Sequence, residues 1–172
     1  MKAFTVLFVA VTALPIFSAE TPRNPGLDAN AAFARLKALA GEWEGNDQKM
    51  GKLRVTYEIV SGGSAVLERF TAEKMPPGSD MVTVYHKDGD GLLLTHYCMA
   101  QNQPRMRATR FDPASGELEF DMLDATNLKP GTGHMHSARF RFADEKRFSS
   151  EWKFMEAGQT KFTESMEYRR VR

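Results

Sequence analysis

The sequence predicts an all-β protein: an up-and-down antiparallel β-barrel of about eight to ten strands, preceded by one short N-terminal helix. From residue 42 to the end of the chain, apolar and polar residues alternate with a period of two, as in strands that bury one face. Clusters of Gly, Pro, Asp and Ser separate these segments at short intervals. Because such short loops cannot make a parallel crossover, each strand is expected to pair antiparallel with the next.

The helix is predicted over residues 29–40. Asp28 is placed to cap its first turn, and Phe33, Leu36 and Leu39 recur every three to four residues on one face. Gly41 is expected to end the helix, since glycine is the usual residue just past a helix terminus. The helix therefore offers one apolar stripe for packing against the strands.

Ten segments carry the strand pattern, and 52–60 shows it most clearly. The one longer connection, 124–133, is expected to be a surface loop at a mouth of the barrel. Ten strands can stack as two sheets or close into a barrel, and a meander without long crossovers favours closure, which removes edge strands. A closed barrel of this size has room for a small ligand. The expected strands are 42–46, 52–60, 65–74, 80–87, 91–98, 105–111, 117–123, 134–142, 148–155 and 161–169.

The N-terminus differs in character from the rest of the chain. Residues 1–19 combine Lys2, an almost wholly apolar run and small residues at the end, which is typical of a secretory signal peptide. Residues 20–27 are polar with two prolines and are interpreted as a linker, and 28–172 as a single barrel domain. The sequence thus predicts an exported protein of bacterial type, secreted or periplasmic. Retention of the apolar run as a membrane anchor is the alternative, because a run of this length is ambiguous.

The composition excludes several classes of protein. A chain of 172 residues suits one domain with its own core. Lys and Arg total 23 and Asp and Glu 22, so no basic surface for nucleic acid is predicted. Cys98 is the one cysteine, which excludes an intrachain disulfide and a multi-cysteine metal cluster. No second long apolar run follows the first, so no stable membrane insertion is expected after signal cleavage. The oligomeric state stays open.

A short helix, then Gly41-Glu42-Trp43 at the start of the first strand, then a meander, resembles the calycin-type barrels: lipocalins, fatty-acid-binding proteins and nitrobindin-like proteins. The large C-terminal helix and the disulfide of lipocalins are missing. The resemblance implies a barrel interior that holds a small molecule. It also implies that an arginine near the C-terminus, Arg169, Arg170 or Arg172, lies over the ring of Trp43.

Strict alternation assigns an inward face to each of the later strands. Over 134–142 that face holds His134, His136 and Phe140; over 148–155 it holds Trp152; over 161–169 it holds Glu164. On the two earlier strands the same alternation turns His96 and Cys98, and then Met106, Ala108 and Arg110, inward. Glu68 or Arg69, whichever faces inward on 65–74, is also a candidate buried charge.

Strand direction then places His96, His134, His136 and Glu164 at one mouth of the barrel and His86 at the other. The leading hypothesis is an exported barrel that binds a small apolar or amphipathic ligand, with these four side chains holding its polar group and Trp152 and Phe140 lining the apolar part. The identity of any ligand or cofactor stays open.

Three alternatives use the same residues. His-x-His on a strand has metal-ligand spacing, so His96, His134, His136 and Glu164 are candidate ligands of a metal or of haem iron. The histidines and Glu164 are also candidates for an acid/base pair in an enzyme, although the chain lacks the common nucleotide-binding, hydrolase and metalloprotease motifs, which disfavours catalysis. Finally, the histidines can be structural rim residues of a stability or assembly domain. Cys98 is interpreted as a buried small side chain rather than a nucleophile.

The signal-peptide assignment is tested by the N-terminus of the mature protein. Cleavage is expected after Ser18 or Ala19, so N-terminal sequencing of the exported fraction should begin at Ala19 or Glu20. Recovery of intact Met1 on a membrane-bound protein would contradict the assignment.

Overall fold

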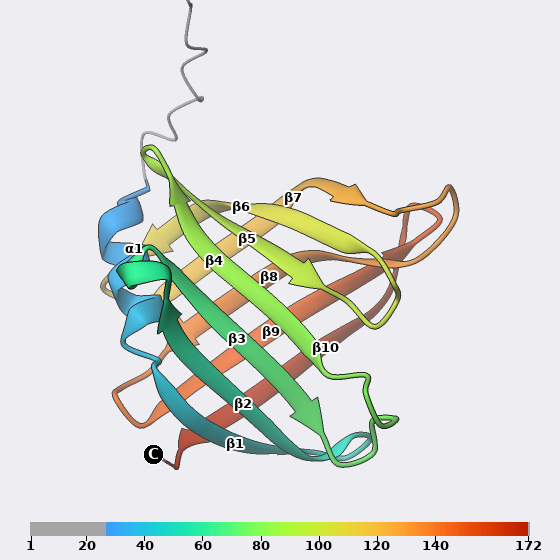
Figure 1. The fold of residues 1–172 in the computed structure, drawn as a ribbon, viewed down its shortest axis with the longest axis horizontal. Coiled ribbons are helices and arrows are strands. Elements are labelled where there is room, and N and C mark those ends of the chain that lie inside the picture. Colours follow the sequence, from blue (N-terminus) through green and yellow to red (C-terminus); the bar gives the residue numbers. More distant parts are fainter. Residues whose placement is uncertain (1–26, 172) are drawn as a thin grey trace, which may run out of the picture.

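Ten antiparallel strands close into a barrel in the computed structural model, which describes residues 27–171 (Figure 1). Each strand pairs with its neighbours in sequence, and β1 closes the ring against β10. The predicted fold class is confirmed, and every predicted strand segment coincides with an observed one. The strands are β1 (Gly41–Asp47), β2 (Gly51–Val60), β3 (Ala65–Ala72), β4 (Met81–Asp88), β5 (Gly91–Tyr97), β6 (Gln103–Asp112), β7 (Glu117–Thr126), β8 (His134–Phe142), β9 (Arg147–Glu156) and β10 (Gln159–Arg170).

The predicted signal peptide, 1–19, and all but the last residue of the predicted linker, 20–27, lie outside the described residues. Within 27–171, no helix is long and apolar enough to cross a membrane.

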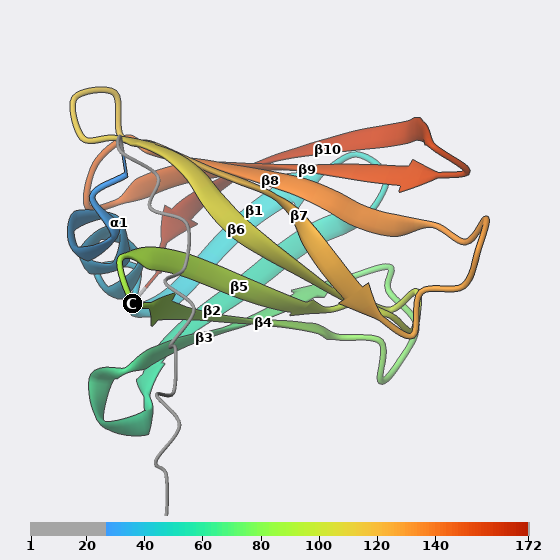
Figure 2. The ribbon, with the colours of Figure 1, turned by 90° about the horizontal axis from the view of Figure 1, so that it is seen from above.

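The one α-helix of the described residues, α1 (Ala29–Lys37), covers one end of the barrel (Figures 1 and 2). The Asp28 carboxylate accepts a hydrogen bond of 2.9 Å from the backbone N–H of Ala31, which satisfies one of the free donors of the first turn. Phe33 and Leu36 are buried, as the apolar stripe predicts. The helix ends three residues earlier than predicted, and the chain turns through 38–40 into β1. The hairpins β1–β2, β5–β6 and β9–β10 lie at the opposite end, here called the open end.

Trp43 joins the helix, the first strand and the last strand. Its side chain is fully buried, and its indole N–H donates a 2.7 Å hydrogen bond to the carbonyl of Leu39. The guanidinium of Arg170 lies 4.2 Å from the indole centroid and donates hydrogen bonds to the carbonyls of Ala38 and Ala40. The expectation of a C-terminal arginine over Trp43 is confirmed, and Arg170 is the residue that fills this position.

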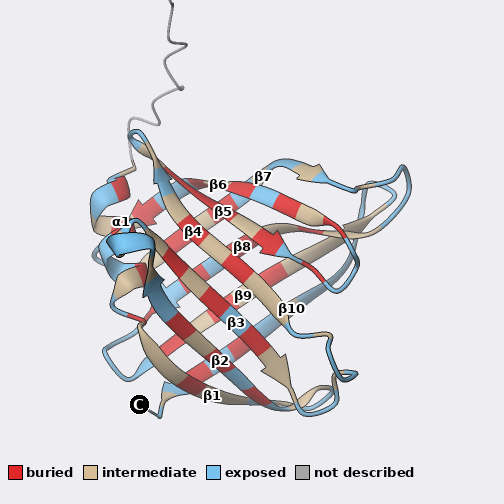
Figure 3. Cartoon of the chain, viewed as in Figure 1, coloured by how far each residue is buried: buried red, intermediate tan, exposed pale blue. Residues whose placement is uncertain are grey.

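Buried and exposed residues alternate along the strands, so that buried residues form bands across the barrel (Figure 3). The alternation breaks in β6, where a bulge between Ala108 and Arg110 shifts the pairing with β7. The extra residue changes the phase of the strand, so Phe111 is buried instead of Arg110. The predicted inward orientation of Arg110 is therefore wrong.

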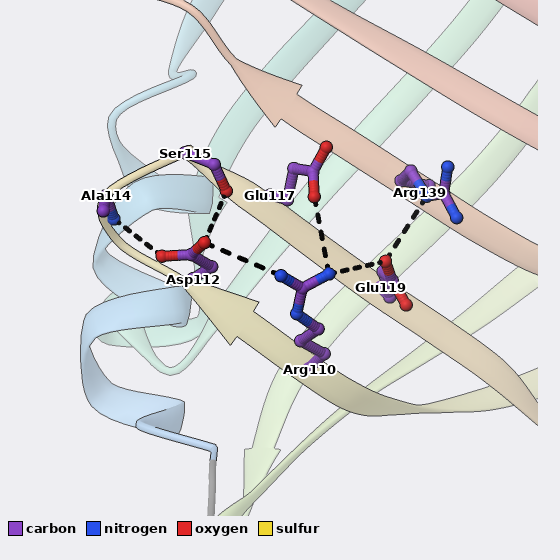
Figure 4. A network of polar contacts seen from close by, with 7 residues as sticks. All are labelled: Arg110, Asp112, Ala114, Ser115, Glu117, Glu119 and Arg139. Atoms are coloured by element: carbon purple, nitrogen blue, oxygen red, sulfur yellow. Dashed lines mark hydrogen bonds and ion pairs between the residues drawn. The ribbon is translucent and has the colours of Figure 1, made fainter.

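Arg110 lies on the outer surface at the centre of an ion-pair network (Figure 4). Its guanidinium contacts the carboxylates of Asp112, Glu117 and Glu119, and Glu119 also contacts Arg139. These pairs are well exposed, so each contributes little to stability. They mark the outer face of β6, β7 and β8.

The packing of Trp43 makes a prediction about stability. Trp43→Ala should lower the free energy of unfolding by about 3–5 kcal/mol, because it removes a fully buried ring and leaves a cavity between α1 and the barrel. Chemical denaturation measures the change. Tyr97→Ala is the control, since half of the Tyr97 side chain is exposed and its loss should cost under about 1 kcal/mol. Equal losses in the two variants would contradict the role assigned to Trp43.

Candidate functional site

A row of four side chains crosses the inner face of β2 to β5. The strand register pairs Tyr57 with Glu68, Glu68 with Thr83, and Thr83 with His96. All four are buried, and three of them carry polar groups that ordinarily lie at a surface. Glu68, not Arg69, is the inward residue of β3, because Arg69 forms an ion pair with Asp80 on the outside.

Hydrogen bonds connect this row through the buried phenol of Tyr85. The Tyr85 hydroxyl donates to Oε2 of Glu68 at 2.5 Å, and Tyr57 also hydrogen bonds to this carboxyl group. The Oγ1 of Thr83 lies 2.9 Å from Nδ1 of His96, and the Thr83 hydroxyl is near enough to the Tyr85 phenol to lower its pKa. A line of polar contacts therefore leads from His96 through Thr83 and Tyr85 to Glu68.

The donors along this line of contacts can be assigned in one consistent direction. The single proton of the Tyr85 hydroxyl goes to Glu68, so the phenol oxygen accepts from the Thr83 hydroxyl. The Thr83 proton is then used, and Oγ1 accepts from Nδ1–H of His96. In this assignment the one proton of the neutral imidazole is on Nδ1, and the unpartnered Nε2 is an acceptor.

His96 is almost completely buried, and its Nε2 has no hydrogen-bond partner among the described residues. Its ring lies 5.0 Å from the ring of Trp152, which comes from the opposite wall of the barrel. Burial lowers the pKa of His96 from its ordinary value of 6.5 to about 4, so the ring is neutral at physiological pH. An unpartnered polar atom in such a place calls for an explanation, since buried acceptors are normally satisfied.

His96 lines a small cavity inside the barrel. About 20 Å³ of this cavity is open to a water-sized molecule, which is room for roughly one water. Three of the lining residues are methionines, whose flexible side chains can repack around a bound molecule. The lining contains no lysine or arginine. It consists of Tyr57, Glu68, Phe70, Met81, His96, Met135, Ser150, Trp152, Glu164, Met166 and Tyr168.

Two carboxyl groups line this cavity. Burial raises the pKa of Glu68, although hydrogen bonds from Tyr85 and Tyr57 oppose the rise. Burial also raises the pKa of the half-buried Glu164, and the charge of Asp47 adds to the rise. Because Asp47 lies in the β1–β2 hairpin, Glu164 marks the side of the cavity nearest the open end.

His134 and His136 do not line the cavity. The predicted inward orientation of both is wrong, because a bulge between Met135 and Ser137 in β8 shifts the pairing with β9. Met135 is buried and lines the cavity instead. Nε2 of His134 lies 3.2 Å from Nδ1 of His136, and the two rings form a half-buried pair of their own.

The remaining predicted residues lie in or beside the cavity. Trp152 and Glu164 line it together with His96. Phe140 faces inward, as predicted, but is fully buried in the aromatic core between Phe120 and Trp152, where it does not line the cavity. Cys98 is buried and free, and burial raises the pKa of its thiol, which keeps it in the unreactive protonated form.

The four candidate metal ligands therefore do not converge. Within residues 27–171, no group of three or more His, Cys, Asp or Glu side chains is placed to hold a metal ion. Haem, the other group for which these residues were candidate ligands, does not fit the observed arrangement. His96 offers a free Nε2, but a cavity with room for one water cannot hold a porphyrin.

A much wider depression, of about 1010 Å³, lies between β1, the β6–β7 turn and the ends of β8 to β10. Its charged residues include pairs exposed to solvent, such as Arg169 with Glu44. None of the buried unpartnered polar atoms of the described chain lies in it. The internal cavity is therefore the better candidate site, although it is smaller.

The sequence analysis missed Thr83 and Tyr85 as site residues, and it did not decide whether Glu68 or Arg69 faces inward. The alternation in 80–87 was sufficient to put Thr83 and Tyr85 on one face. Their contact with Glu68 and His96 depends on the register of four strands, which no local pattern specifies.

The strand pairing makes this protein a closed ten-stranded antiparallel barrel, and that barrel fits the calycin-like architecture. Among solved structures, the chain is similar to a protein of unknown function from the DUF3598 family of Nostoc punctiforme PCC 73102, with 9% identity and a TM-score of 0.52. The similarity covers 79% of this chain and 49% of that one, so this chain spans about half the length of its structural neighbour. At this identity the likeness concerns the fold alone. No protein-family model and no curated protein matches the chain.

The burial of His96 predicts a pH dependence of stability. The folded state holds the pKa at about 4 and the unfolded state near 6.5, so the unfolded state binds more protons between these values. The contribution of His96 to the free energy of unfolding is fully present above pH 6.5 and is lost as the pH falls from 6.5 to 4. Because one pKa unit corresponds to about 1.4 kcal/mol, the loss is about 3 kcal/mol.

Denaturation curves of the wild type and of His96→Leu isolate this contribution, since the raised pKa values of Glu68 and Glu164 act with the opposite sign in both proteins. As the pH falls from 7 to 4, the free energy of unfolding of His96→Leu should rise by about 3 kcal/mol relative to that of the wild type, because the variant lacks the histidine that the unfolded wild type protonates. His86→Leu is the matched control for the same substitution outside the cavity, since the His86 ring contacts the carbonyl of Lys87 instead. If the difference in stability between His96→Leu and the wild type did not change with pH, the ring of His96 in the wild type would be hydrated and the assignment would be wrong.

Proposed function

We propose that this protein binds a small ligand inside the barrel, in the cavity lined by His96, Trp152 and Glu164. The observation that carries the proposal is the buried Nε2 of His96, which has no hydrogen-bond partner within residues 27–171 although His96 lines a cavity that can admit one. A ligand that donates a hydrogen bond there satisfies the orphaned acceptor. We also propose that the protein is exported, on the strength of its N-terminal sequence.

The ligand in this proposal has few non-hydrogen atoms. The cavity has room for roughly one water while its side chains stay in place, so a larger ligand must displace Met81, Met135 or Met166. Long unbranched thioether side chains move at low cost. Entry is from the open end, because α1 and Trp43 fill the other end.

The interior is polar at its centre, which reverses the arrangement inferred from the sequence. Glu68, Thr83 and His96 are buried deep between the walls, whereas the sequence placed the polar groups at the rim above an apolar floor. The cluster proposed to hold the polar group of the ligand is thus His96 with Glu68 and Glu164. His134 and His136 have no part in it.

The test is an NMR titration of the exported protein with n-butanol, a short chain with one hydroxyl donor. The chain has two tryptophans, and their indole resonances report on two places: Trp152 on the cavity and Trp43 on the end of the barrel covered by α1. Butanol should shift the resonance of Trp152, which touches His96, and leave that of Trp43 in place. His96→Leu should weaken binding by about tenfold, since a hydrogen bond to a buried group is worth about 1–3 kcal/mol.

The double variant His134→Ala with His136→Ala is the control and should bind butanol as the wild type does, because neither ring lines the cavity. Unchanged binding in His96→Leu would sink the proposal, as would a loss confined to the double variant. Native mass spectrometry of the purified wild type additionally shows whether a small molecule is retained.

A further inference from the structure

The charges around the cavity do not balance. Two carboxyl groups, Glu68 and Glu164, line it, and neither forms an ion pair with a lysine or arginine in the part of the chain that the structure describes. Lys49 lowers the pKa of Glu164 less than burial raises it, and it is itself exposed on the β1–β2 hairpin. The third titratable group, His96, is neutral and lines the same space, and its Nε2 has no partner among the described residues. The cavity thus offers an unpartnered imidazole nitrogen and two carboxyl groups, with no lysine or arginine in its lining.

We propose that the ligand is a small organic amine, bound as its ammonium ion. The inference rests on the proposed function, and it adds the chemical class of the ligand. An ammonium group has three N–H donors and no acceptor. The cavity presents three acceptors: Nε2 of His96 and the carboxyl groups of Glu68 and Glu164. One positive charge also compensates carboxylates that are costly to bury alone.

The rest of the lining suits the same ligand. Trp152, Tyr57, Phe70 and Tyr168 bring aromatic rings to the cavity, and ring faces attract cations. Methionines surround the alkyl part of the ligand. A carboxylate ligand meets two like charges here and no basic side chain, so fatty acids are disfavoured. A neutral alcohol satisfies His96 and leaves the carboxyl groups uncompensated.

Three probes of equal chain length separate these possibilities: n-butylamine, n-butanol and butanoate, titrated at pH 8 against the Trp152 indole resonance. Butylamine should bind about tenfold or more tightly than butanol, since hydrogen bonds between charged groups are roughly twice as strong as neutral ones. Butanoate should cause no shift. High salt should weaken the binding of butylamine and leave that of butanol unchanged.

Glu164→Gln tests the charge directly. It should reduce the preference for butylamine over butanol about tenfold while leaving the affinity for butanol within about twofold of the wild type. Glu151→Gln is the matched control: it makes the same change of net charge beside Trp152 but on the outer face of β9, where Glu151 contacts Ser165. Glu151→Gln should keep the preference. Glu68→Gln, which retains an acceptor for Tyr85, should act as Glu164→Gln does.

The outcomes distinguish the two proposals. Equal binding of butylamine and butanol, both lost in His96→Leu, would overturn the amine assignment and leave internal ligand binding intact. Tighter binding of butanoate, or an amine preference that survives both glutamate substitutions, would also overturn the assignment. If no probe shifts Trp152, the proposed function fails together with the inference.

Discussion

The barrel depends on a short seam between its first and last strands. β1 and β10 pair directly at only two positions, Trp43 with Arg170 and Glu44 with Arg169. The first of these is strengthened by the guanidinium of Arg170, which lies over the indole and reaches two carbonyls at the end of α1. Ring stacking, hydrogen bonds and strand pairing thus act on the same two residues. Closure removes the free edges of the sheet, and it also brings α1 over one end.

Closure at this seam determines where a site can form. Because α1, Leu39 and Trp43 fill one end of the barrel, we expect a ligand to reach the interior from the other end. Closure also creates an interior with walls on all sides, so any polar group placed there is removed from water. The same burial acts on both kinds of titratable group: it lowers the pKa of His96 and raises that of Glu68. Burial disfavours the charged form of each group in the absence of an opposite charge, and hydrogen bonds to Thr83 and from Tyr85 hold the two side chains in place.

Most of the fold could be predicted from the sequence, because it follows from local patterns. The period of two, the short turns and the cap at Asp28 each act within a few residues, and each was observed. The errors came where one extra residue changes the phase of a strand. Bulges in β6 and β8 turned Arg110, His134 and His136 away from the interior, and alternation alone cannot reveal an inserted residue. His96 and Trp152 were placed on the inner face correctly because their strands keep a regular phase up to those positions. Glu164 was placed correctly because it follows the irregularity between Thr160 and Phe162, after which β10 pairs regularly with β9.

The polar contacts that lead from His96 to Glu68 could not be predicted either, but the reason is not a bulge. They require Tyr57, Glu68, Thr83 and His96 to be direct cross-strand partners, and register is a relation between strands rather than a property of one. A slip of one residue between β3 and β4 would bring Arg69 inward, place a cation beside the histidine and cancel the negative charge of the cavity. The chemistry of the interior is therefore set by the register of β2 to β5. The outer pair of β8, His134 and His136, has the more conspicuous sequence pattern but borders no enclosed space.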